Sequence, residues 1–136
     1  MSDDYFKTAD RMQRDSRVLH DNKCWHNACY LAGYVVEAGL KAIIRADEID
    51  RGVHPTQYPH NIARLVRLVT PVSLIMGRNF DDSGQINSST LLRRWHPRYR
   101  YQPTEWDGET LSQDFQKTAE YMMDFLTELW MDGVIR

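Results

Sequence analysis

Apolar and small residues recur at helical spacing along most of the chain. The first stripe advances in steps of three or four residues: Tyr5, Ala9, Met12, Ser16 and Leu19. This spacing predicts a helix over about 3–19. No segment shows a sustained alternation of period two, which a half-buried strand would need. We therefore expect one all-α domain over 1–136, an up-and-down bundle of four or five helices.

The segment 28–44 is apolar on nearly every side at helical spacing. This pattern is typical of a helix at the centre of a bundle, here expected over about 24–45. Gly33 and Gly39 lie inside it, and each costs about 1 kcal/mol relative to alanine in a helix interior. We expect a neighbouring helix to approach closely at these glycines.

Two charged residues, Glu37 and Lys41, interrupt this apolar segment one helical turn apart. Charges are rarely buried without partners, so the pair has two interpretations. It forms the polar floor of a cleft, or Glu37 is buried and anchors an arginine from elsewhere in the fold. The structural interpretation is favoured, and we predict that Glu37 contacts an arginine within 93–100.

Three further helices are expected after two polar loops over about 47–59 and 77–87. The first begins near residue 60 or 61 and is stopped or kinked at Pro71, although a further turn can follow. The second is short and is capped by Ser88 or Ser89. The third runs from about 109 to 133. Its methionine and aromatic residues are interpreted as core or dimer surface: Met122, Met123, Phe125 and Trp130.

Composition narrows the class of protein. A net charge of -2 with 26% charged residues excludes a strongly basic or a disordered chain, although a local basic patch can still bind nucleic acid. The acidic start of the chain predicts no signal peptide, and no apolar stretch is long enough for a membrane span. Cys24 and Cys29 are expected to be reduced, which favours a cytoplasmic location.

No metal or other cofactor is expected. The histidine pairs His20 with His26 and His54 with His60 are each six residues apart, which does not place two ligands on one helix face. No Cys-x-x-Cys or phosphate-binding glycine motif is present. His60 is expected to cap the helix it begins, or to hydrogen-bond locally.

The densest chemical pattern lies at 93–101, where four arginines, one histidine and three aromatics fall within nine residues. Guanidinium groups hold phosphate, and aromatic rings stack on bases. The predicted phosphate contacts are Arg93, Arg94, His96, Arg98 and Arg100. Trp95 and Tyr99 are the predicted stacking residues. In the structural alternative, one arginine pairs with Glu37, a tyrosine packs, and the other side chains are solvated.

Four features follow one another along the chain. They are 37–42 (Glu-Ala-Gly-Leu-Lys-Ala), 60–65 (His-Asn-Ile-Ala-Arg-Leu), an Arg-Tyr pair at 98–99 or 100–101, and a long closing helix. In this order and over almost the whole chain, the sequence resembles the HEPN domain family. The resemblance implies a helical bundle that forms homodimers, and a nucleotidyltransferase partner in a prokaryotic toxin–antitoxin or defence system.

Other members of that family are metal-independent ribonucleases, with an Arg-x4-6-His motif on a late helix. The only such spacing here lies between Arg14 and His20 in the first helix. The absence of the motif from a late helix argues against enzymatic activity. The favoured hypothesis is an accessory protein that binds a nucleotide or single-stranded RNA. The second is a ribonuclease in which His96 is the general acid or base and Arg94 or Arg98 stabilises the phosphorane. The third is a non-catalytic protein-interaction module.

Overall fold

The structure is a computed structural model that describes residues 4–55, 57–102 and 108–135. These residues form helices and contain no strand, which confirms the all-α prediction. The elements are α1 (Tyr5–Asp21), α2 (Trp25–Asp50), α3 (Ile62–Ile75), α4 (Thr90–Arg94), the 3-10 helix η1 (Pro97–Tyr101) and α5 (Glu109–Met131).

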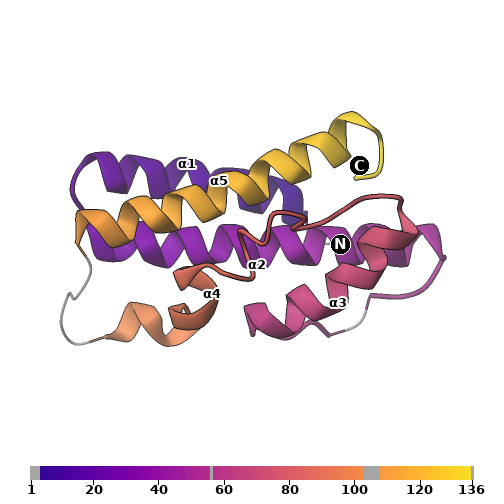
Figure 1. Cartoon of the computed structure of the whole chain (residues 1–136), viewed down its shortest axis with the longest axis horizontal. Coiled ribbons are helices and arrows are strands. Elements are labelled where there is room, and N and C mark those ends of the chain that lie inside the picture. Colours follow the sequence, from indigo (N-terminus) through magenta and orange to yellow (C-terminus); the bar gives the residue numbers. More distant parts are fainter. Residues whose placement is uncertain (1–3, 56, 103–107, 136) are drawn as a thin grey trace.

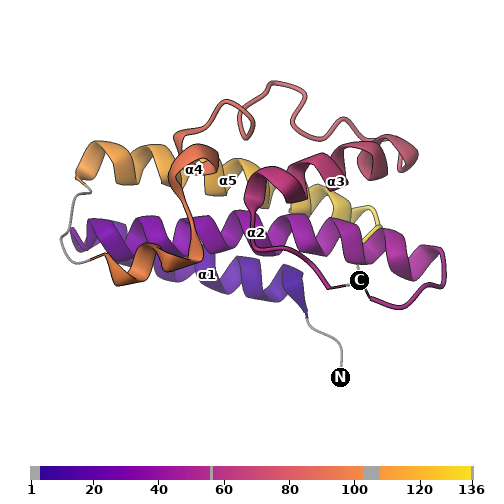
Figure 2. The ribbon, with the colours of Figure 1, turned by 90° about the horizontal axis from the view of Figure 1, so that it is seen from below.

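Helix α2 is the axis of the bundle and contacts α1, α3, α5 and η1. Helices α1 and α5 lie along one side of α2, while α3, α4 and η1 lie on the other (Figure 1). Helix α1 runs opposite to α2, but α3 and α5 run in the same direction as α2 (Figures 1 and 2). Because α2, α3 and α5 run in one direction, the topology departs from strict up-and-down alternation (Figures 1 and 2).

The ends of the helices follow local capping chemistry. Asn61 accepts a hydrogen bond from the backbone N–H of Arg64, and Ser89 accepts one from that of Leu92. Helix α2 extends five residues past its predicted end at 45 because the side chains of residues 46–48 are buried. Helix α3 continues through Pro71 to Ile75.

Both glycines of α2 lie where another side chain contacts the helix. A Cβ atom on Gly33 would lie 2.0 Å from Trp95 Nε1, and one on Gly39 would lie 2.7 Å from Met122 Cγ. Close approach is therefore confirmed at both glycines, although at Gly33 the neighbour is a residue that follows α4. Both contacts are within the chain, so the glycines serve the packing of this bundle.

The core surrounds α2 and includes much of α5. Met122 and Met123 of α5 are buried in it, and Phe125 is partly buried. Trp130 is 53% exposed, and its ring stacks on Phe6 of α1 with 6.0 Å between centroids. The largest fully buried side chains include Phe115, Leu40, Ile43, Leu65, Ile86, Leu91, Met122 and Leu126.

Candidate functional site

The basic segment, defined as residues 93–101, comprises the end of α4, a two-residue link and η1. Two of its three aromatic side chains are buried, whereas its basic side chains and Tyr101 are exposed. Trp95 and Tyr99 are 6% and 3% exposed. The basic residues are all exposed: Arg93, Arg94, His96, Arg98 and Arg100. The fold therefore separates an anchoring inner row from a charged outer row.

The anchors are specific contacts with α2. Trp95 Nε1 donates a hydrogen bond to the backbone oxygen of Tyr30 at 2.9 Å, and its ring packs edge-on against Tyr34. Tyr99 stacks on the buried His26 with 4.8 Å between ring centroids. Trp95 and Tyr99, which the sequence predicted to stack on bases, are core residues instead. Burial against α2 leaves neither ring face open to a ligand.

Among the described residues, no carboxylate forms an ion pair with Arg93, Arg98 or Arg100. Arg93 donates to the backbone oxygen of Ser88 at 3.3 Å. The Arg100 guanidinium lies over the rings of Tyr30 and Tyr101, 5.8 and 5.1 Å from their centroids. These positive charges remain available to an anion.

Two interactions affect the charge and the hydrogen bonding of the basic segment. A hydrogen bond to Tyr30, with favourable interactions with neighbouring tyrosines, raises the pKa of the Arg100 guanidinium above its ordinary value. Arg100 is therefore a permanent cation. His96 caps η1, because its Nδ1 accepts a hydrogen bond from the backbone N–H of Arg98 at 3.1 Å. That bond occupies Nδ1 and does not involve the other ring nitrogen of His96, whose side chain is exposed.

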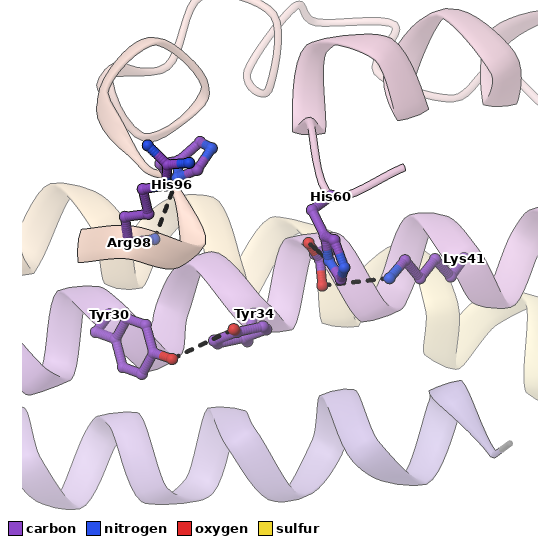
Figure 3. Close-up of polar contacts among 7 residues, drawn as sticks. Tyr30, Tyr34, Lys41, His60, His96 and Arg98 are labelled. Carbon is purple, nitrogen blue, oxygen red and sulfur yellow. Dashed lines mark hydrogen bonds and ion pairs between the residues drawn. The ribbon is translucent and has the colours of Figure 1, made fainter. Parts of the chain in front are cut away.

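Glu37 is buried, as predicted, with 4% of its surface exposed. The prediction of an arginine partner is wrong. One carboxylate oxygen, Oε2, lies 3.4 Å from Lys41 Nζ, and the other, Oε1, lies 3.2 Å from His60 Nδ1 (Figure 3). Lys41 is 9% exposed and sits one turn along α2, where helix geometry places it beside Glu37. The arginines point away because Trp95 and Tyr99 anchor the segment that carries them.

His60 does not cap α3, since Asn61 occupies that position. Instead, its ring reaches back to α2 and contacts Glu37 (Figure 3). The His60 side chain is 68% exposed, in contrast to the buried carboxylate it contacts. His60 and the basic segment lie on the same side of α2 (Figure 3).

Sequence reasoning missed Tyr30 and Tyr34. Their hydroxyl groups are 3.2 Å apart, with Tyr30 donating to Tyr34. Burial, followed by the bond to Tyr30, raises the pKa of Tyr34. Together with Glu37 and Lys41 they form the α2 polar stripe, a row at helical spacing. That spacing, four, three and four residues, was the available signal.

Arg14 and His20, which match the Arg-x4-6-His spacing of the ribonuclease members, are not arranged as an active site. Arg14 is exposed on α1 and pairs with Asp10 at 3.3 Å. His20 Nδ1 lies 2.7 Å from Ser112 Oγ of α5, and its ring packs edge-on against Trp25. Each residue is engaged with its own neighbours, so the pair does not form a catalytic centre.

Comparison with models of protein families, with curated proteins and with solved structures finds no match for this chain. In the described part of the chain, no cluster of three or more histidine, cysteine or acidic side chains is arranged to hold a metal ion. None of the helices within the described ranges combines the length and apolar character needed to cross a membrane.

Proposed function

We propose that the protein binds a nucleotide or single-stranded RNA through the outer row of the basic segment. One observation carries the proposal: Arg93, Arg98 and Arg100 are exposed, have no carboxylate partner among the described residues, and lie on a short segment that buried aromatics fix to α2. Because the buried aromatics hold its backbone, the segment loses little backbone freedom on binding, which favours affinity for phosphate. No acidic residue occurs within 88–102, so this positive charge is locally uncompensated in sequence.

The proposed phosphate contacts are the exposed basic residues Arg93, Arg94, His96, Arg98 and Arg100. Trp95 and Tyr99 hold the segment in place. Tyr101 takes over the stacking role, because its ring is 73% exposed and lies beside Arg100. Base stacking on such a ring contributes about 1–3 kcal/mol. The resemblance to HEPN domains extends the proposal to a cytoplasmic accessory protein of a toxin–antitoxin or defence system, paired with a nucleotidyltransferase.

Affinity for single-stranded RNA is expected to fall as salt rises, because phosphate contacts release counterions. The double change Arg93→Ala with Arg98→Ala removes two such contacts. It should reduce the slope of log affinity against log salt by about 1.4, at about 0.7 per phosphate contact on a single strand. Fluorescence titration of a labelled oligonucleotide at several salt concentrations measures the slope.

The matched control is Arg11→Ala with Arg14→Ala, which removes the same charge from α1 on the other side of α2. It should leave the slope almost unchanged. Equal losses in the two double variants would attribute binding to net charge alone. Absence of binding even at low salt would favour the protein-interaction module.

A metal-independent ribonuclease remains the second candidate, and the position of His96 favours it. His96 is exposed between Arg94 and Arg98, with Nδ1 held by the cap of η1. A histidine beside arginines can transfer a proton while a cation stabilises the charge that develops on phosphate. Cleavage of labelled RNA in EDTA that His96→Ala abolishes would establish this activity. Intact RNA under the same conditions supports binding alone.

We also propose that the chain forms a homodimer. Large apolar side chains are exposed on α3: Leu68, Leu74 and Ile75, at 46%, 62% and 80%. An obligate interface would bury roughly 2,000 Å² or more in total and could cover them. Light scattering is expected to report about 32 kDa, twice the 16.0 kDa of the chain. Ile75→Asp should shift the mass to that of the monomer, and a wild-type monomer at micromolar concentration would refute the dimer.

A further inference from the structure

Given the proposed function, on which this inference rests, we propose that His60 is a specificity residue that accepts a hydrogen bond from a ribose 2′-hydroxyl. The ligand class is then RNA, and DNA of the same sequence binds more weakly. The proposal starts from the contact between His60 Nδ1 and Glu37 Oε1 at 3.2 Å.

The carboxylate of Glu37 selects the tautomer of His60. An ionised carboxylate only accepts hydrogen bonds, so Nδ1 must carry the proton in this contact. In a neutral imidazole the other nitrogen, Nε2, then holds a lone pair and acts as an acceptor. The side chain is 68% exposed, and within the described ranges no residue is bonded to Nε2. Nε2 of His60 is therefore an oriented acceptor open to solvent.

The two charged residues beneath His60 are buried and carry opposite charges. Glu37 is almost fully buried, and Lys41 Nζ lies 3.4 Å from its second oxygen. The Asn61 cap fixes the backbone of the next residue at the start of α3. Because Lys41 compensates the charge of Glu37, a phosphate chain passing this point meets little net repulsion.

An acceptor at this position excludes some ligand groups. Unprotonated phosphate oxygens are acceptors too, so they cannot bond to the lone pair on Nε2. The 2′-hydroxyl is a donor that every ribonucleotide carries whatever its base, and DNA lacks it. A ribose therefore fits a sequence-independent acceptor, whereas the arginines of the basic segment fit the phosphates.

The spacing along α2 allows one strand to reach both places. Arg100 lies over Tyr30, and His60 contacts Glu37, seven residues further along the helix. Seven residues span about 10 Å at a rise of about 1.5 Å each. At about 3.4 Å per stacked nucleotide, a strand covers that axial distance with about three nucleotides. The inference thus predicts a ligand longer than a mononucleotide.

If His60 had only a structural role, its contact with Glu37 would hold the start of α3 against α2. Such a contact contributes to the free energy of unfolding, but it does not distinguish RNA from DNA. The ratio of the affinity for RNA to the affinity for DNA therefore distinguishes a specificity role of His60 from a structural one.

The test uses the full chain and two labelled oligonucleotides, a uridine decamer and its deoxyuridine counterpart, at about pH 8. The wild-type protein should bind RNA about 5–10-fold more tightly than DNA, the size expected for one net hydrogen bond. His60→Ala should abolish that preference by weakening RNA binding and leaving DNA binding unchanged. His54→Ala, an exposed histidine of the same connection, is the matched control and should keep the preference.

A second measurement needs no ligand. Two-bond proton–nitrogen correlation NMR on the folded protein should show His60 protonated at Nδ1 and unprotonated at Nε2. The opposite tautomer would overturn the proposal. Equal affinity for RNA and DNA with a normal salt slope would also overturn it while leaving the proposed function intact. Failure to bind either oligonucleotide would overturn both.

Discussion

Gly33→Ala is expected to destabilise the protein by about 1–5 kcal/mol. The new methyl group would lie 2.0 Å from Trp95 Nε1, so the rigid indole must move and its hydrogen bond to the Tyr30 carbonyl is lost. Overpacking costs about 1–3 kcal/mol and an unsatisfied buried group a further 1–3, against a gain of about 1 kcal/mol in helix propensity. Denaturant unfolding with linear extrapolation measures the difference.

Gly39→Ala is the matched control on the same helix. Its Cβ would meet Met122 Cγ at 2.7 Å and Leu126 Cδ1 at 3.0 Å. Methionine is flexible and adapts to a small change in volume, so the loss should be clearly smaller than at Gly33. Similar losses at both glycines would show that the indole contact has no special role. The Gly33 variant should also bind RNA more weakly, because Trp95 anchors the basic segment.

Glu37→Ala is expected to reduce the free energy of unfolding by about 3–5 kcal/mol. The carboxylate is 4% exposed, and its removal leaves Lys41, itself 9% exposed, as a buried cation without its partner. Breaking one side of a buried ion pair has an effect of this size, because the remaining charge is desolvated without compensation. A change below about 0.5 kcal/mol would show that the site is well solvated.

The double change Glu37→Leu with Lys41→Met tests the physical reason. It removes both charges and keeps the approximate volumes, so most of the stability should return. A double variant as unstable as Glu37→Ala would mean that the lost contact with His60 dominates. His60→Ala separates the two contributions, because it removes only the exposed partner and should have a small effect on stability.

Helix α2 shows which features of the candidate site could be predicted from the sequence. Glu37 and Lys41 are polar residues in an apolar segment, so their burial together could be inferred from composition and spacing. The partner of Glu37 could not be inferred. Lys41 is adjacent by helix geometry, but His60 reaches Glu37 only because the 51–61 connection returns along α2. The arginine proposed for this role was excluded by the orientation of the segment that carries it.

The basic segment also has features that the sequence predicts and features that only the fold decides. Its charge and aromatic density are visible in the sequence, and they predicted a candidate site at 93–101. Which side chains face solvent was undetermined, because a two-residue link and the 3-10 helix Pro97–Tyr101 have too few residues for a periodic pattern. Trp95 and Tyr99 face inward only because Gly33 and His26 of α2 provide space and a stacking surface.

By itself, the sequence determined the helical class, the central position of α2, the near approach at its glycines and the position of the basic segment along the chain. Periodicity and side-chain volume are local properties of the chain, and local physics is enough to predict them. The tertiary structure alone decided which aromatic rings are anchors, which atoms hold Glu37, and that His60 and the arginines lie on one side of α2. Those facts depend on contacts between residues far apart in sequence, and no local pattern specifies such contacts.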